Sequence, residues 1–151
     1  MSRAIYFDLD GTLANLYAVE NWLEKLRQYD ETPYRHAEPM LNMQTLARLL
    51  NRKQREGYII GVVSWLSKEP EPTYDERVTR AKIEWLKEHL HSVHFDEIHI
   101  IAYGVAKSTV VADKDGILFD DELNNRKEWA AAGSGLAFDV TNIIEILKGL
   151  H

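Results

Sequence analysis

The chain has 151 residues, no cysteine and a formal net charge of −6 at neutral pH. This length suits one domain with a substantial core, and the lack of cysteine excludes disulfides, thiolate metal sites and cysteine nucleophiles. The acidic balance disfavours extended nucleic-acid binding, and the absence of a membrane-length apolar run or a signal-peptide pattern predicts a cytoplasmic protein without membrane contact. Oligomer formation is compatible with this composition.

The first element is an apolar run, Ala4 to Phe7, which is followed by Asp8, Asp10 and Gly11. The run predicts a buried strand that breaks into a turn at the glycine. Two carboxylates held this close repel each other, and the repulsion either raises one pKa or requires a cation between them. Carboxylate oxygens suit magnesium, although Asp and Gly are also common in ordinary turns.

The next segment, Asn15 to Leu41, does not fit a minimal alternation of strands and helices. Apolar residues at helical spacing predict an amphipathic helix over Tyr17 to Tyr29. Two prolines predict a loop over Asp30 to Pro39. A second helix is expected from Asn42, as its N-cap, to about Gly57.

The rest of the chain alternates strands with helices. Tyr58 to Val63 is a near-continuous apolar strand that ends at Ser64, which is typical of a parallel sheet covered on both faces. A capping-box pattern at Thr73 to Glu76 predicts a helix that continues to about Leu90. The remaining expected elements are strands over 98–102, 117–119 and 136–138, a helix over 124–132 ended by Gly133, and a helix from an N-cap at Thr141 to Lys148.

This order of elements predicts a three-layer α/β sandwich around a five-stranded parallel Rossmann-like sheet with right-handed crossovers. Ligands of such sheets bind outside the carboxyl ends of the strands. The residues that end each predicted strand are therefore the candidates for a site: Asp8, Asp10, Ser64, the loop after Ala102, Asp120 and Asp121.

Four motifs in this order resemble those of the haloacid dehalogenase-like (HAD) superfamily of phosphohydrolases. Residues 4–13 match its first motif, a hydrophobic strand followed by D-x-D-G-T/V, and Ile117 to Asp121 match its fourth, an apolar strand ending in paired acids. Ser64 and Lys107 stand where the second and third motifs place a hydroxyl and a lysine. Two other lysines compete by position for the third motif: Lys68 and Lys114.

The resemblance implies a magnesium-dependent phosphatase. Asp8 would be the nucleophile that forms an aspartyl-phosphate, and Asp10 would protonate the leaving oxygen and then activate water. Ser64 would donate a hydrogen bond to the phosphoryl group, and Lys107 would supply fixed positive charge.

The same resemblance implies a set of magnesium ligands. Asp8 and Asp120 would hold the ion together with the main-chain carbonyl of Asp10. Asp121 would reach the metal through water or would orient Lys107. An acidic pair at the start of a helix is the minority alternative for Asp120 and Asp121, because Asp8 and Asp10 form a second pair of acids in the same chain.

The expected substrate is a small phosphorylated molecule, in particular a nucleoside monophosphate. The stretch from Ala81 to Asp121 resembles 5'(3')-deoxyribonucleotidases, and residues 15–41 resemble a small helical cap inserted after the first motif, although the cap is much shorter than in that subfamily. Trp65 and Tyr17 are candidates for stacking on a base, and Arg35 for contacting the substrate.

Three alternatives remain at this stage. A phosphatase with a short cap would admit a bulky substrate such as a phosphorylated nucleic-acid end, against which the net charge weighs. A signalling receiver domain also combines acids, Ser or Thr and Lys on a five-stranded sheet, but Ile98 to Ala102 does not end in Asp. A non-catalytic binding relative is disfavoured because both Asp8 and Asp10 are present.

Overall fold

A computed structural model of the chain describes residues 3–151. Within these residues the centre is a five-stranded parallel sheet in the order β3-β2-β1-β4-β5. The strands are β1 (Ala4–Phe7), β2 (Ile59–Trp65), β3 (Glu97–Ile101), β4 (Ile117–Phe119) and β5 (Ala137–Phe138). The predicted fold class is confirmed, and the strand before the first pair of acids occupies the middle of the sheet.

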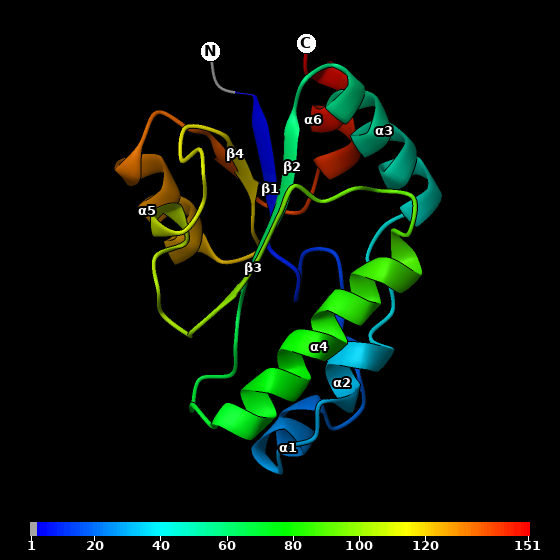
Figure 1. Cartoon of the computed structure of the whole chain (residues 1–151), viewed down its shortest axis with the longest axis vertical. Coiled ribbons are helices and arrows are strands. Elements are labelled where there is room, and N and C mark those ends of the chain that lie inside the picture. The colour runs from blue at the N-terminus through cyan, green and yellow to red at the C-terminus, as the bar shows by residue number, and fades with distance from the viewer. Residues whose placement is uncertain (1–2) are drawn as a thin grey trace.

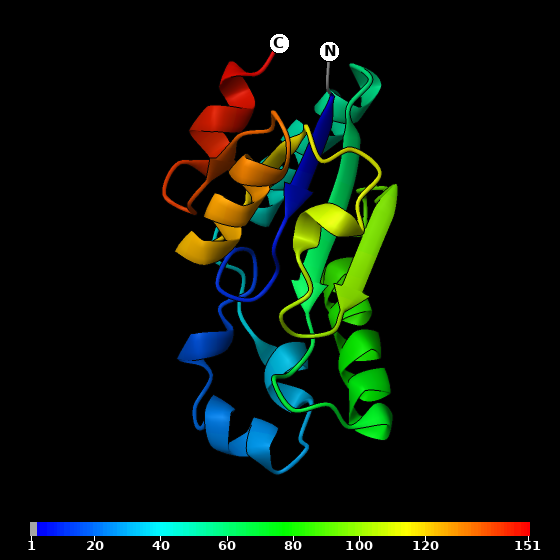
Figure 2. The same cartoon turned by 90° about the vertical axis from the view of Figure 1, so that its left-hand side faces the viewer.

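Helices cover both faces of the sheet, as Figure 1 and Figure 2 show. One face carries α3 (Met43–Arg55), α6 (Ile143–Gly149) and the C-terminal half of α4 (Pro72–His89). The other face carries α5 (Leu123–Ala132) and a short 3₁₀ turn, η2 (Lys107–Thr109). No helix within residues 3–151 is both long enough and apolar enough to span a membrane.

Strand β1 shows how the apolar run builds two cores. Successive side chains of a strand point to opposite faces. Ile5 and Phe7 therefore join the larger core with residues of α3, α4 and α6, whereas Ala4 and Tyr6 join the smaller core with Trp129 of α5. All four residues of β1 are buried, so the strand is a fixed support for the acids that follow it.

A polar contact crosses the sheet beneath α5. The Tyr6 ring passes over Gly61, where a Cβ would lie 2.7 Å from Tyr6 Cδ1. The Tyr6 hydroxyl donates to Glu97 Oε2 at 2.6 Å, and Glu97 Oε1 accepts from the backbone N of Ala112 at 3.0 Å. The glycine thus allows β1, β3 and the segment before β4 to be joined through one carboxylate.

The predicted helix over Tyr17 to Tyr29 is wrong in its extent. The structure has a 3₁₀ turn, η1 (Leu16–Ala18), and a short helix, α1 (Trp22–Arg27). Asn21 and Tyr29 have φ angles of 57° and 59°, in the left-handed region. Because this conformation does not continue a right-handed helix, it interrupts the apolar periodicity at both places.

The predicted loop over Asp30 to Pro39 is also wrong, because it contains the helix α2 (Thr32–His36). Asp30 Oδ1 accepts from the backbone N of Thr32 at 2.9 Å, and Pro33 lies in the first turn, where proline is compatible with a helix. Both α1 and α2 lie beyond the carboxyl edge of the sheet, where α2 packs against α4 (Figure 1).

The predicted N-cap Asn42 is confirmed, since its side chain accepts from the backbone N of Thr45 at 2.9 Å. The capping box at Thr73 is wrong, because α4 begins at Pro72 and Glu71 accepts from the backbone of Thr73 and Tyr74. The final helix likewise begins after Asn142 rather than Thr141. The backbone N of Thr141 instead donates to Asp139 Oδ1 at 2.9 Å.

Candidate active site

The acids that follow β1 and β4 lie side by side because these strands are neighbours in the sheet. The backbone N of Asp8 donates to the carbonyl O of Phe119 at 2.9 Å, which continues the pairing past the end of β1. The exposed fractions of Asp8 and Asp120 are only 7% and 0%. Two carboxylates are thus held with little access to water at the carboxyl edge of the sheet.

The turn after β1 requires the glycine at position 11. Gly11 has a φ of +79°, and a Cβ there would collide with the Asp121 carboxylate and lie 2.8 Å from the Tyr17 ring. The carbonyl O of Leu9 accepts from the backbone N of Thr12 at 3.2 Å and closes the turn. This turn lets the chain reverse beside Asp121 without a side chain in the way.

Lys107 links the two strand ends. Its Nζ donates to Asp8 Oδ1 at 2.9 Å and to Asp120 Oδ2 at 2.7 Å, while Thr12 Oγ1 donates to Asp8 Oδ2 at 3.2 Å. Burial lowers the pKa of Lys107, but the carboxylates of Asp8 and Asp120 outweigh it and the pKa is raised, so the ammonium stays charged. The two lysines that compete with it by position are both exposed: Lys68 and Lys114.

Three carboxylates at this edge lie close enough together to bind one cation. Oxygens of Asp8, Asp120 and Asp121 lie within 4.8 Å of one another. Burial, followed by the charge of Asp8, raises the pKa of Asp120. Burial and a hydrogen bond with Asp8 raise the pKa of Asp121 to about 8. A divalent ion would relieve this repulsion, and the all-oxygen donor set suits magnesium.

The Asp10 side chain lies outside this group of three and binds a lysine that the sequence reading missed. Lys82, which is 0% exposed on α4, donates through Nζ to Asp10 Oδ2 at 2.9 Å. The same nitrogen donates to Ser64 Oγ at 2.7 Å and to the carbonyl O of Trp65 at 2.6 Å. Burial raises the pKa of Asp10 against the opposing effect of Lys82.

Ser64, predicted as a phosphoryl-binding hydroxyl, is buried at the end of β2. An ammonium group can only donate, so Ser64 Oγ accepts from Lys82 and its own hydroxyl proton is not used in that bond. The hydroxyl therefore retains a donor for an anionic oxygen at the edge of the sheet.

Helix α5 holds Asp120 directly and Lys107 through the next residue, Ser108. Asn125 Nδ2 donates to Asp120 Oδ2 at 3.2 Å, and Arg126 Nη1 donates to the carbonyl O of Asp120 at 2.9 Å. Ser108, the residue after Lys107, donates through Oγ to Glu128 Oε2 at 2.6 Å. The helix thus fixes both ends of the contact between lysine and carboxylate.

The three residues predicted to select the substrate lie in different surroundings. Tyr17 is half-exposed beside the acidic turn, where burial and the charge of Asp121 raise the pKa of its hydroxyl. The Trp65 ring lies 5.5 Å from Lys107 Nζ. Arg35 instead forms an ion pair with Glu84 of α4, so its charge is paired within the protein.

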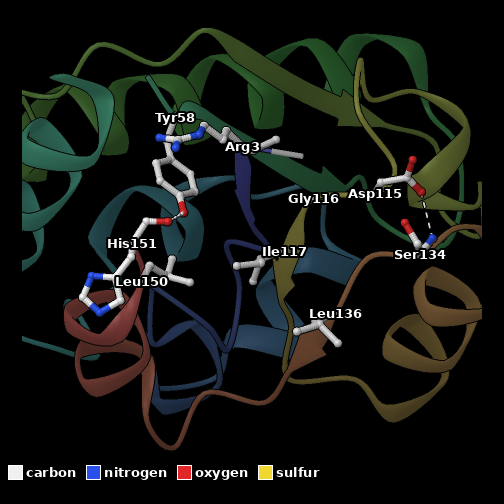
Figure 3. A pocket seen from close by; sticks show the side chains of 10 residues that line it. Arg3, Tyr58, Asp115, Gly116, Ile117, Ser134, Leu136, Leu150 and His151 are labelled. Atoms are coloured by element: carbon white, nitrogen blue, oxygen red, sulfur yellow. Dashed lines mark hydrogen bonds between the residues drawn. The ribbon is translucent and has the colours of Figure 1, made fainter. Parts of the chain in front are cut away.

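A separate hollow lies at the opposite, amino end of the sheet, as Figure 3 shows. Its lining includes the first residues of β1 and β4, Ala4 and Ile117. The Tyr58 hydroxyl donates to the carbonyl O of His151 at 3.2 Å on one side of it. The clustered acids and both buried lysines of the carboxyl edge lie elsewhere, so the candidate site is the carboxyl edge.

Comparison with known proteins bears on the fold. No family model matches the chain, and no curated protein matches its sequence. Among solved structures, it is similar to D,D-heptose 1,7-bisphosphate phosphatase from Burkholderia thailandensis, with a TM-score of 0.53 and 13% sequence identity over 86% of this chain and 73% of that one. The chain has a HAD-like fold. At this identity the likeness describes the HAD-like fold, and the chemistry has to be argued from the residues.

Proposed function

We propose that the chain is a magnesium-dependent phosphomonoester hydrolase that works through an aspartyl-phosphate on Asp8. The observation that carries the proposal is that two buried lysines at one edge of the sheet bind different carboxylates. Lys107 binds Asp8 and Asp120, whereas Lys82 binds Asp10. A nucleophile and a proton donor two residues apart therefore have different partners, as two-step phosphoryl transfer requires.

In the first step, a carboxylate oxygen of Asp8 attacks phosphorus, and the bond from phosphorus to the leaving oxygen breaks. Lys107 stabilises the negative charge on the phosphoryl oxygens, and the Ser64 hydroxyl donates to one of them. Asp10 gives its proton to the leaving oxygen. The raised pKa of Asp10 favours the protonated form that this step needs.

In the second step, the ionised Asp10 takes a proton from water as the water oxygen attacks the phosphorus of the aspartyl-phosphate. The bond between phosphorus and the Asp8 oxygen breaks, which restores the Asp8 carboxylate and releases inorganic phosphate. Lys82 keeps Asp10 beside the strand end throughout, because its Nζ is also anchored to Ser64 and to the Trp65 carbonyl.

Asp8, Asp120 and Asp121 are the residues that would hold magnesium, together with the main-chain carbonyl of Asp10. An ion held there would offset the repulsion between the anionic nucleophile and the phosphoryl group. Asn125, whose Nδ2 donates to Asp120 Oδ2, would keep that carboxylate in place for it. We expect chelator to abolish activity and added magnesium to restore it.

We further propose that the substrate is a nucleoside monophosphate and that residues 15–41 form a small cap of a single HAD-like domain. The resemblance of the stretch from Ala81 to Asp121 to 5'(3')-deoxyribonucleotidases supports this substrate. Two partly exposed aromatic rings beside the acidic turn and Lys107, those of Tyr17 and Trp65, are suited to a base.

The test is phosphate release, with magnesium, from nucleoside 5'- and 3'-monophosphates, sugar phosphates and a phosphorylated oligonucleotide. We expect mononucleotides to be preferred, and Asp8→Asn to reduce turnover at least about a thousandfold while circular dichroism and the thermal midpoint keep their folded values. An Asp8→Asn protein with wild-type turnover would overturn the nucleophile. Preference for the oligonucleotide would replace the mononucleotide with a nucleic-acid end.

A further inference from the structure

Two aromatic side chains form a pair that continues directly from the candidate active site. Trp65 is the last residue of β2, and Tyr103 lies just beyond the end of β3. Their ring centroids are 4.9 Å apart, with the ring planes inclined at 55°. The Nζ of Lys107, the proposed phosphoryl-binding lysine, lies 5.5 Å from the centroid of the Trp65 ring.

The pair is held by the loop that follows β3. Trp65 Nε1 donates to the carbonyl O of Val105 at 2.8 Å, which fixes the indole against this loop. The backbone N of Val105 donates to the carbonyl O of Ala102 at 3.2 Å and closes a turn around Tyr103. Gly104 has a φ of +87° in this turn, a conformation that glycine adopts without strain. The loop therefore presents Tyr103 in a defined place.

Tyr103 is 51% exposed although it is fixed against Trp65. Buried aromatic rings contribute to a core, whereas a half-exposed ring at a strand end leaves part of its face open to solvent. Such a face binds other planar rings by stacking, and it does so with little dependence on which ring is offered. Because Lys107 Nζ lies 5.5 Å from the Trp65 ring, a molecule whose phosphate group contacts the lysine can place a planar ring on this pair.

We propose that Trp65 and Tyr103 form a platform on which the planar leaving group of the substrate stacks, either a nucleobase or another aryl group. The inference rests on the proposed function and deepens it, because it assigns leaving-group recognition to the β2 and β3 ends of the domain and adds Tyr103 to the candidate site. Residues 15–41 are then not the sole source of selectivity.

Binding of two isosteric phosphonates tests the platform without turnover. Benzylphosphonate carries a planar ring, and cyclohexylmethylphosphonate carries a saturated ring of similar size. With magnesium present, we expect calorimetry to give an about fivefold lower Kd for the planar compound in the wild-type protein. Tyr103→Leu should remove this preference while leaving the Kd of the saturated compound within about twofold.

The matched control is Tyr29→Leu. Tyr29 is 49% exposed and also packs on a second aromatic ring, that of Tyr74, but it lies two residues beyond the end of α1. The control should keep the wild-type preference. Equal Kd values for the two phosphonates in the wild-type protein, or an undiminished preference in Tyr103→Leu, would overturn the platform.

Failure of the proposed function gives a different result. A protein that prefers the planar phosphonate through Tyr103 but releases no phosphate from any monoester would retain the platform and lose the hydrolase assignment. Release of phosphate from nucleoside monophosphates, unaffected by Tyr103→Leu, would retain the hydrolase and refute the platform. Comparing nucleoside monophosphates with phenyl phosphate then separates a nucleobase from a general aryl group.

Discussion

Besides Lys107, two lysines are buried among residues 3–151, and their surroundings differ. Lys82 contacts Asp10, Ser64 and the Trp65 carbonyl at the carboxyl edge. Lys53 is also almost fully buried, but it donates to Glu56 at the amino end of β2. Burying a charge is costly unless it is paired and hydrogen-bonded. Both lysines have such partners, and only those of Lys82 belong to the candidate site.

We predict that Lys82→Met lowers kcat about 100-fold, because Asp10 loses the group that positions it for proton transfer. Lys82 lowers the pKa of Asp10, so the limb of the pH–rate profile that belongs to Asp10 should also move to higher pH. Steady-state kinetics across pH, well below the thermal midpoint of the variant, gives both quantities.

Lys53→Met is the control for that substitution, since it removes a buried ammonium of the same size far from the acids. It should lower the thermal midpoint while the folded protein keeps the wild-type kcat. Similar losses of kcat in both variants would mean that Lys82 acts only on stability.

The raised pKa of the Asp121 carboxyl should make the stability of the metal-free protein depend on pH. Its pKa of about 8 in the folded protein is far above the ordinary value of 3.8. The folded state then holds a proton that the unfolded state has lost, so stability should fall as pH rises toward and through about 8. In excess chelator, urea midpoints should decrease from about pH 6 to about pH 9, and less steeply in Asp121→Asn. Equal slopes in the two proteins would contradict this.

At the residue scale, the site could be predicted where an apolar strand is followed directly by charged side chains. The acids after β1 and β4 were identified because two apolar strands end in paired carboxylates. Lys82 was missed because a lysine in an amphipathic helix is normally assigned to the solvated face. The signal was present, since Lys82 falls on the same stripe as Val78 and Trp85, and all three are buried on α4.

At the element scale, α5 holds two segments of the candidate active site in place. Asn125 donates to Asp120, and Glu128 accepts from Ser108, which directly follows Lys107. Two residues on one helix thus hold two segments that are separated by β4. A shift of this helix would change the distance between the lysine and the carboxylates.

We predict that Glu128→Ala lowers kcat/KM about tenfold, because η2 loses its anchor and Lys107 is held less accurately. Lys127→Ala, an exposed neighbour on the same helix, should leave kcat/KM unchanged. Kinetics of both variants with one phosphomonoester provides the comparison. An equal kcat/KM in the two variants would show that the contact between Ser108 and Glu128 is dispensable.

An element could be predicted from the sequence when neighbouring residues determine its conformation. The strands were predicted well because a sheet buried on both faces needs continuous apolar runs. The segment between β1 and α3 was predicted poorly, since left-handed residues at Asn21 and Tyr29 divide one apolar pattern into separate turns. The helix α2 has only five residues and packs against α4, so its local start signals, Asp30 and Pro33, were too weak to predict it.

At the scale of the whole molecule, residues 15–41 are attached firmly to α4. Leu16 and Tyr34 share an apolar cluster with Tyr74, Val78 and Ala81. Polar contacts add to this cluster: Tyr74 Oη to the Asp30 carbonyl at 2.9 Å, Trp85 Nε1 to the Ala37 carbonyl at 2.8 Å, and an ion pair between Arg77 and Glu31 at 3.3 Å. The segment is therefore part of the packed domain.

We predict that residues 32–37 exchange their backbone amide hydrogens about as slowly as the first half of α4, because opening α2 would expose the shared cluster. Hydrogen–deuterium exchange followed by mass spectrometry, with and without magnesium, measures this. Fast exchange of residues 32–37 beside a protected α4 would instead identify a cap that opens on its own.

The contact between Trp65 and Lys107 has an optical consequence. An ammonium 5.5 Å from an indole ring acts on the energy of its excited state, and a phosphate dianion on the same ammonium would largely cancel that field. Trp85 and Trp129 are buried in the two cores and supply a nearly constant background emission, and the fourth tryptophan, Trp22, which packs on Tyr17, is replaced by Phe for this measurement. The intrinsic fluorescence of the protein should therefore report whether its phosphate site is occupied, and Trp65→Phe would silence the signal.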